Sequence, residues 1–189
     1  MSELKLDVDQ ASELKAAFRR GNWTNAEIKK ICEGNVLEQF REVILGHAEI
    51  VQIKYVIDCD ADPFCPNDWK VNKHKKGGQL EWDLAKTLLY LSDVQKKGGI
   101  IEGDELRKEI ENMPVLNANV LVYLLAHQQL VPEEWKNKAV FFWGTIYCDS
   151  SDGKLYVSVL RWSGYAWVPS FFWLGGVFNC SCPAALLAS

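Results

Sequence analysis

The alternation of hydrophobic and polar positions is clearest between residues 139 and 174, where aromatic and β-branched side chains dominate. Such side chains fit the pleated surface of a sheet, and clusters of turn residues divide the segment into three parts. We therefore predict three antiparallel strands, at residues 139–148, 155–162 and 165–174. The rest of the chain is expected to pack on or beside them.

The turns between these strands carry their own signals. Residues 149–154 form the first loop, in which Gly153 is suited to a positive φ angle, and Ser163 and Gly164 form a tighter second turn. Pro169 has no backbone N–H to donate to a neighbouring strand. The third strand is therefore predicted to lie at an edge of the sheet or to be broken at this proline.

Strict alternation assigns the side chains of the first strand to two faces. The first face would carry Phe141, Trp143, Thr145 and Tyr147, and the second would carry Val140, Phe142, Gly144 and Ile146. Both faces are largely apolar. We therefore expect one face to meet helices and the other to meet further sheet or a ligand.

Helical spacing of apolar residues covers residues 10–46 and predicts three short helices. The first is expected to be capped by Asp9 or Ser12 and to end at Gly21. Thr24, followed three positions later by Glu27, is a capping box that opens the second helix. The predicted N-terminal caps continue with Asn35 for the third of these helices and, further along the chain, Asn117.

The middle of the chain gives a mixed pattern. Residues 49–58 are predicted to form a strand, and residues 63–78 a loop with a local cluster of lysines around His74. A helix is predicted from Asp83 to the glycine pair at 98–99. Further predicted elements are an extended piece at 100–101, a helix from Asp104 to Pro114, a helix after Asn117 and a docked, uncharged tail at 175–189.

Composition and the N-terminal sequence indicate the cellular compartment in which we expect the protein. The 189 residues carry a net charge of −4, which does not indicate binding to nucleic acid. The N-terminal residues are charged and lack the apolar core of a signal peptide, and no apolar run is long enough for a transmembrane helix. We therefore expect a cytoplasmic protein, in which the six cysteines are free thiols.

The aromatic segment is also the first candidate binding surface. Large rings most often belong to a core, but rings exposed on a sheet stack against sugars, peptides or bases. The residues predicted to line such a surface are Trp143, Trp162, Trp167, Trp173, Tyr147 and Tyr156.

Three carboxylates at alternate positions give the second candidate site. Asp58, Asp60 and Asp62 follow the predicted strand at 49–58, so they would point to one side and offer oxygen ligands to Mg²⁺ or Ca²⁺. His74 would be the base of such a metal-dependent hydrolase. The alternative is a solvated loop in which the acidic residues cap turns.

Two further hypotheses rest on less specific patterns. A zinc site would combine His74 with cysteines, although no CxxC motif is present, and its ligands would come from Cys59, Cys65, Cys180 and Cys182. The three N-terminal helices invite a helix-turn-helix interpretation. Their basic residues are interleaved with glutamates, however, whereas a DNA-binding helix normally shows a clearer basic face.

Several segments resemble those of a group of short, uncharacterised bacterial proteins. They are DADPFCPNDWKV at 60–71, HKKGGQ at 74–79, VLNANVLVYLL at 115–125, VPEEWK at 131–136, FFWGTIY at 141–147 and PAALLAS at 183–189. The resemblance covers much of the last two thirds of the chain. It implies a bacterial protein with one shared architecture, and it brings no activity, cofactor or catalytic residue with it.

These patterns together predict an α+β fold with short N-terminal helices, a mixed middle and a C-terminal, aromatic-rich antiparallel sheet. The expected domains are a helical region at 1–48 and an α+β domain at 49–189, or one continuous domain. The favoured function is non-catalytic binding of a protein or a small ligand by the aromatic sheet. The alternatives are a hydrolase that uses Asp58, Asp60 and Asp62, and nucleic-acid binding by the helical region.

Overall fold

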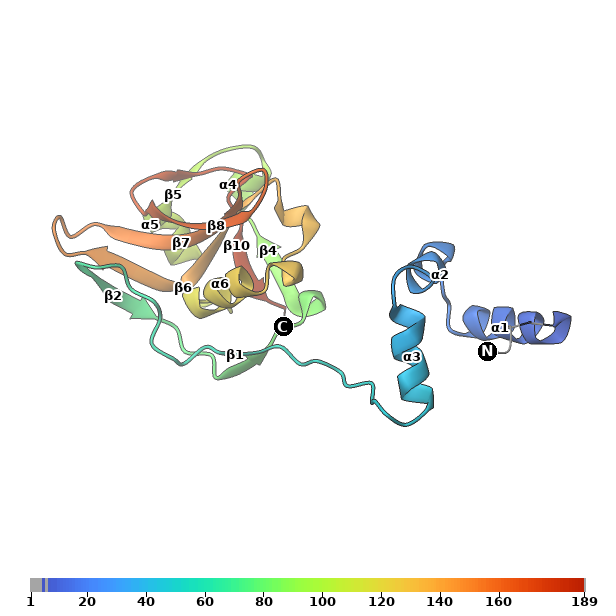
Figure 1. Cartoon of the computed structure of the whole chain (residues 1–189). Coiled ribbons are helices and arrows are strands. Elements are labelled where there is room, and N and C mark those ends of the chain that lie inside the picture. The colour runs from blue at the N-terminus through green and yellow to red at the C-terminus, as the bar shows by residue number, and fades with distance from the viewer. Residues whose placement is uncertain (1–4, 6, 189) are drawn as a thin grey trace. The chain divides into compact units, whose positions relative to one another are not determined.

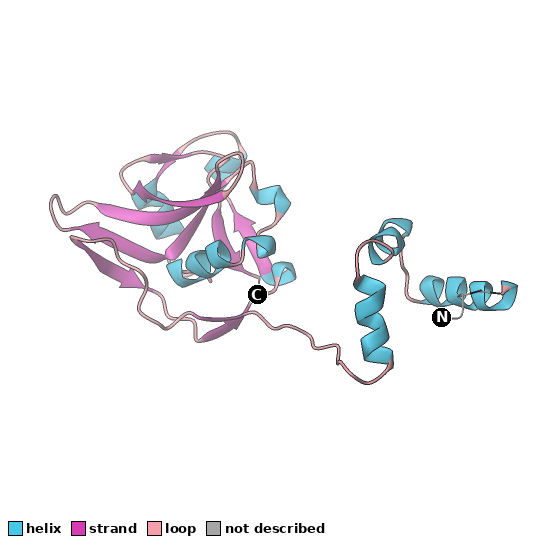
Figure 2. Ribbon diagram, viewed as in Figure 1, coloured by secondary structure: helices cyan, strands magenta, loops and turns pink. Residues whose placement is uncertain are grey.

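The chain is described by a computed structural model that covers residue 5 and residues 7–188. Its internal contacts divide it into two units, Met1–Ile53 and Lys54–Ser189. Figure 1 traces the elements in order, and Figure 2 shows that the first unit is helical whereas the strands lie in the second. The predicted α+β class is therefore confirmed.

The described part of the first unit contains three short helices, α1 (Val8–Arg20), α2 (Asn25–Ile31) and α3 (Val36–Ile44). The capping box of α2 is confirmed: the Thr24 hydroxyl accepts the Glu27 N–H, and the Glu27 carboxylate accepts the Thr24 N–H. Helix α1 begins earlier than predicted, because the side chain of Asp7, and not that of Asp9 or Ser12, caps it. None of the helical residues is buried.

A six-stranded mixed sheet forms the centre of the second unit. Its strand order is β4–β10–β6–β7–β8, and β2 also pairs with β6. These strands are β2 (Trp69–His74), β4 (Thr87–Tyr90), β6 (Ala139–Asp149), β7 (Leu155–Trp162), β8 (Trp167–Trp173) and β10 (Ala184–Leu187). The three predicted aromatic strands correspond to β6, β7 and β8. Strand β8 lies at an edge, as Pro169 predicted.

The tail is docked, as predicted, but its role in the sheet was not foreseen. Strand β10 pairs antiparallel with β4 and parallel with β6, so the last described strand lies inside the sheet. A second strand from the tail, β9 (Val177–Phe178), pairs with β5 (Ile101–Glu102) in a separate ribbon. The predicted antiparallel pairing of β6, β7 and β8 is therefore confirmed, and the wider sheet to which they belong is mixed.

A β-bulge in β6 changes which side chains share a face. The pairing of β6 with β7 slips between Phe142 and Ile146. As a result Trp143 and Ile146 pack together on one face, whereas Tyr147 lies on the other face with Phe142. Strict alternation had placed Tyr147 on the same face as Trp143, and this assignment was wrong because one slip of register moves every later side chain to the opposite face.

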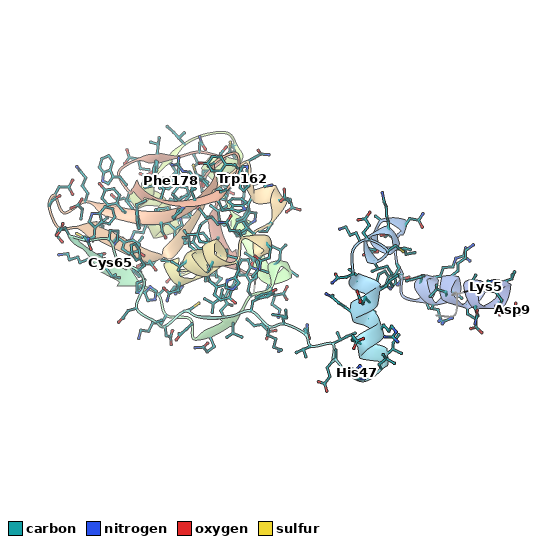
Figure 3. All side chains as sticks on the ribbon, in the orientation of Figure 1. Lys5, Asp9, His47, Cys65, Trp162 and Phe178 are labelled. Atoms are coloured by element: carbon teal, nitrogen blue, oxygen red, sulfur yellow. The ribbon has the colours of Figure 1, made fainter. Side chains whose placement is uncertain are left out.

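The two faces of the sheet are covered differently. Helix α6 (Ala118–Ala126) lies across one face and contributes Leu121 and Leu124 to a core cluster with Phe142 and Leu160. On the other face, helix α5 (Gly103–Glu109) and the β5–β9 ribbon pack against Phe141 and Trp143, with Phe178 at the centre of this cluster (labelled in Figure 3). Large rings thus fill the core on both sides.

Three predictions for the middle of the chain were wrong. Residues 69–74 form strand β2 and not a loop, because the second half of β6 offers them a partner. Residues 87–90 form strand β4 and not a helix, because β10 pairs with them. The predicted strand at 49–58 is reduced to β1 (Val56–Asp58), which pairs with β3 (Gln79–Glu81). The exposed residues 50–54 find no partner strand.

Short helical turns complete the second unit. They are η1 (Leu84–Lys86), α4 (Asp93–Lys96), η2 (Gln128–Leu130) and η3 (Glu133–Trp135). Asp83 caps η1, and Asn117 caps α6 through a bond from the Asn119 N–H, as predicted. Asn35 occupies the position before α3 without a side-chain bond to the helix. Throughout the described residues, no helix has the length and apolar character that crossing a membrane requires.

Candidate functional site

The predicted metal-binding carboxylates are used to shape a loop. The Asp58 carboxylate accepts the N–H groups of Asp60 and Ala61 at 2.9 and 3.2 Å. The Asp60 carboxylate reaches across to a second loop and accepts the N–H groups of Gly77 and Gly78, both at 2.9 Å. The first pattern is the hydrogen-bonded turn that aspartate favours, and the second ties two loops together.

This arrangement leaves no assembled metal site in the part of the chain that is described. No group of three or more His, Cys, Asp or Glu side chains there is close enough to hold an ion. The bond from the Gly78 N–H is the largest cause that lowers the pKa of Asp60, and bonding by Gly77 adds to it. Asp60 is thus an ionised structural carboxylate in this loop.

Replacing Asp60 with asparagine is expected to lower stability at neutral pH and to matter less in acid. The folded-state pKa lies below the ordinary value of 3.8, so the carboxylate stabilises the fold above that value and loses this effect as the pH falls through the folded pKa. Urea unfolding from neutral to acid pH measures the difference. The Asp62 carboxylate accepts no hydrogen bond from any described residue, so Asp62→Asn is the matched control, and equal losses in both variants would contradict this role.

The predicted zinc ligands do not assemble either. Burial, followed by the nearby Asp60 and Asp58 charges, raises the pKa of Cys59 to about 11, so its free thiol stays protonated at neutral pH. Cys65 is half-buried (labelled in Figure 3), and Cys180 is exposed. His74 has both ring nitrogens in hydrogen bonds within the protein.

His74 belongs to a buried polar network with Asn117 and Thr145. The Nε2 atom of His74 lies 3.0 Å from the carbonyl oxygen of Cys59, which also accepts a bond from the Asn117 amide at 2.8 Å. Since a carbonyl only accepts, Nε2 carries a proton. The Nδ1 atom lies 2.8 Å from the Thr145 hydroxyl oxygen, which also accepts the Ala118 N–H. This network occupies both nitrogens, so His74 has no free nitrogen to act as the predicted base.

The backbone of Gly144 joins this network to the sheet. Its N–H donates to the Leu116 carbonyl at 2.8 Å, and its carbonyl accepts the Lys75 N–H at 2.6 Å. The Asn117 amide also donates to the Lys75 carbonyl. Three of the segments quoted in the sequence analysis, at 74–79, 115–125 and 141–147, therefore meet at the bulge of β6. What these segments share is a set of hydrogen bonds that holds the start of α6 and the loop after β2 against β6.

The aromatic residues predicted to form one binding surface are distributed over both faces of the sheet. Trp143 and Tyr147 are buried on opposite faces, and Trp167 is buried beside Trp162 with ring centroids 5.4 Å apart. Trp162 (labelled in Figure 3) is half-buried, and the Lys136 ammonium lies 4.3 Å from its ring.

The remaining two residues of that set, Tyr156 and Trp173, face each other across strands β7 and β8. Trp173 is 45% exposed. Tyr156 packs on Trp69 with ring centroids 4.5 Å apart. Sequence reasoning missed Trp69, which also contacts Tyr147 and Phe171, because its segment was predicted to be a loop.

An apolar pocket of about 180 Å³ lies between α6 and strands β7 and β8. Its lining is mainly hydrocarbon: Phe64, Ala118, Leu121, Val122, Leu125, Tyr147, Pro169 and Phe171, with Ser158 and Ser170. The Ser158 side chain is buried, and its hydroxyl has no hydrogen-bond partner among the described residues. Of the predicted binding residues, only Tyr147 lines this pocket. No pattern in the sequence marked Ser158.

Tyr147 is a further hydroxyl-bearing residue that lines the pocket. Burial, with a smaller effect of Cys65, raises the pKa of Tyr147 far above its ordinary value of 10.0. Tyr147 therefore remains a neutral phenol, able to donate a hydrogen bond, throughout the physiological range. A few neutral hydroxyl groups in a hydrocarbon lining, here those of Tyr147, Ser158 and Ser170, are the kind of arrangement that orients a small ligand.

Basic residues of the N-terminal helices are partly paired with acidic ones. Lys29 lies 4.0 Å from Glu33, and Arg41 lies 3.7 Å from Glu42. These contacts reduce the positive charge that Lys29 and Arg41 present to a polyanion.

Comparison of the chain with protein-family models, with curated proteins and with solved structures gave no match.

Proposed function

We propose that this chain is a non-catalytic binding protein whose pocket between α6 and strands β7 and β8 holds a small neutral molecule with one hydrocarbon ring and one polar group. The observation that carries the proposal is the buried Ser158 hydroxyl, which has no hydrogen-bond partner among the described residues and belongs to the lining of an apolar pocket. A buried hydroxyl without a hydrogen bond costs about 1–3 kcal/mol, and a ligand with a matching polar atom would remove that cost.

The size of the pocket limits the ligand. A cavity of about 150 Å³ in another protein accepts benzene, so about 180 Å³ suits a single ring with a small substituent. Phe64, which is 66% exposed, lies at this pocket and is the side chain that would cover a bound ring. A folded sugar chain or a nucleobase with its ribose would be too large.

The charge of the pocket supports a neutral ligand. No Asp, Glu, Lys, Arg or His residue lines it. An ionised group would lose its hydration there without gaining a counter-ion, which costs several kcal/mol. The ligand should therefore have an apolar ring, one hydrogen-bonding group and no charge. A phenol or a ring-bearing alcohol meets these three conditions, and its hydroxyl would pair with Ser158 or Tyr147.

Ser158→Ala is expected to have opposite effects on the free protein and on ligand binding. The free protein should become more stable by about 1 kcal/mol, because an unpaired buried hydroxyl is removed. Phenol should bind about tenfold more weakly to the variant, whereas toluene should bind to both proteins equally. Urea unfolding measures the first effect, and nuclear magnetic resonance titration of the two ligands measures the second.

The exposed Ser181 provides the control, since Ser181→Ala should change neither quantity. Equal loss of phenol and toluene binding in Ser158→Ala would mean that the hydroxyl recognises no polar group. Absence of binding of both ligands to the unchanged protein would refute the proposed pocket.

A further inference from the structure

A second cavity lies on the opposite face of the sheet, between α5 and strands β2 and β6. Its volume is about 20 Å³. A water molecule needs about 10–15 Å³ of such space, so the cavity admits one or two atoms the size of oxygen. Its charged lining residues are Lys73, Lys75, Arg107 and Glu111, and the indole of Trp143 forms part of its wall.

The indole N–H of Trp143 is the first sign that this cavity has an occupant. Trp143 is only 4% exposed, and its Nε1 atom has no hydrogen-bond partner among the described residues. Tryptophan is a donor only, so the missing partner must be an acceptor. Unpaired buried donors are rare in folded proteins and commonly mark an ion or water.

The charges around the cavity are the second, independent sign. Lys73 is paired with Glu111 at 3.2 Å, and the Lys75 ammonium donates to the carbonyl of Met113 at 2.6 Å. Arg107 is half-buried and forms no ion pair or hydrogen bond within the described part of the chain. Three positive charges against one negative charge leave an excess of two, and the half-buried guanidinium of Arg107 is only partly solvated.

We propose that this cavity is a binding site for a small oxyanion. One oxygen atom of the anion accepts the Trp143 N–H inside the cavity, and the rest of the group lies at the mouth beside Arg107 and Lys75. The guanidinium presents several donors in a fixed plane, which suits phosphate and carboxylate oxygens alike. The site is separate from the apolar pocket, and its existence does not depend on the proposed function.

The indole N–H resonance of Trp143 tests the proposal directly, with the full chain and inorganic phosphate as the first probe. Titration to millimolar phosphate should move this resonance in a saturable way, and sodium chloride at equal ionic strength should not. Acetate forms a second arm: a response to phosphate alone assigns a tetrahedral oxyanion, and a response to acetate alone assigns a carboxylate. The resonance is assigned with Trp143→Phe, which keeps a ring in the core.

Variants on one helix separate a site from general charge screening. Arg107→Gln should weaken binding of the responding anion about tenfold or more, since a charge-assisted bond is lost. Lys108 is exposed and does not line the cavity, so Lys108→Gln, with the same change of charge, should leave the affinity unchanged. Glu111→Gln should strengthen binding, because it removes the competing carboxylate and frees Lys73.

Three results would overturn the proposal. The indole resonance would stay fixed with both oxyanions if the cavity held only water. It would respond equally to chloride if ionic strength alone acted on it. Arg107→Gln and Lys108→Gln would weaken binding to the same degree if the anion were attracted only by the net charge of the helix.

Discussion

Gly144→Ala is expected to destabilise the second unit by about 3 kcal/mol, the upper end of the usual cost of overpacking a core. An added Cβ would lie 2.8 Å from the Cα and Cβ atoms of Asn117 and 2.9 Å from its backbone nitrogen. These atoms belong to the start of α6, whose position is fixed by the buried polar network. Neither segment can move away without breaking the bonds of Gly144 to Leu116 and Lys75.

Urea unfolding followed by tryptophan fluorescence measures this loss. Gly153→Ala is the control, because Gly153 has a φ angle of +71° with nothing within 4 Å of an added Cβ. Its cost is limited to the strain of that backbone conformation, about 1 kcal/mol. If the two variants lost the same stability, the close approach of α6 to the bulge would not constrain the fold.

Asn117→Ala is expected to destabilise the same unit by about 2–4 kcal/mol. The side chain is buried and makes three bonds: its amide donates to the carbonyls of Cys59 and Lys75, and its oxygen accepts the Asn119 N–H that caps α6. Alanine would leave the Lys75 carbonyl without this buried partner and would remove the cap. Each of these losses costs about 1–2 kcal/mol.

Asn119→Ala is the matched comparison for this variant. Asn119 lies two positions further along, and its half-buried side chain donates to the carbonyls of Asp58 and Ala61 in an exposed setting. Water can replace those bonds, so the loss should be about 1 kcal/mol. Hydrogen exchange should show increased opening of β2 in Asn117→Ala but not in Asn119→Ala. The reverse order of stabilities would mean that the loop at 58–61, and not the buried network, holds α6 against the bulge of β6.

Local patterns in the sequence predicted the elements that depend on neighbouring residues. Alternation of rings with β-branched residues located β7 at its observed bounds and β6 to within one residue. The capping box at Thr24 and the cap at Asn117 also followed from sequence, because each is completed within three positions along the chain. Pro169 marked an edge strand for the same reason, since a missing donor is a property of the residue itself.

Elements that depend on distant partners could not be predicted in this way. Leu88 stands at a helical spacing with Leu84 and Leu91, and only pairing with β10, almost a hundred residues further along the chain, makes residues 87–90 a strand. Residues 69–74 are polar at several positions and pair with β6 at similar range. In both cases the tertiary partner overrides the local preference.

The candidate sites also combine features that local sequence predicts with features that only the folded chain reveals. Tyr147 was selected for its chemistry but assigned to the wrong face, because the bulge at Gly144 has no signature apart from the glycine itself. Ser158 was not selected at all, since a serine in a strand is unremarkable until the fold shows that its buried hydroxyl has no hydrogen-bond partner in the described part of the chain. The aspartates at 58 and 60 were noted for their spacing, but their N–H partners are a property of the folded loop.

The position of β10 inside the sheet affects when the sheet can form during protein synthesis. Strands β4 and β6 are synthesised before residues 184–187, which pair with both of them. Their facing backbone groups stay unpaired in the nascent chain, and such open edges attract strands from other copies.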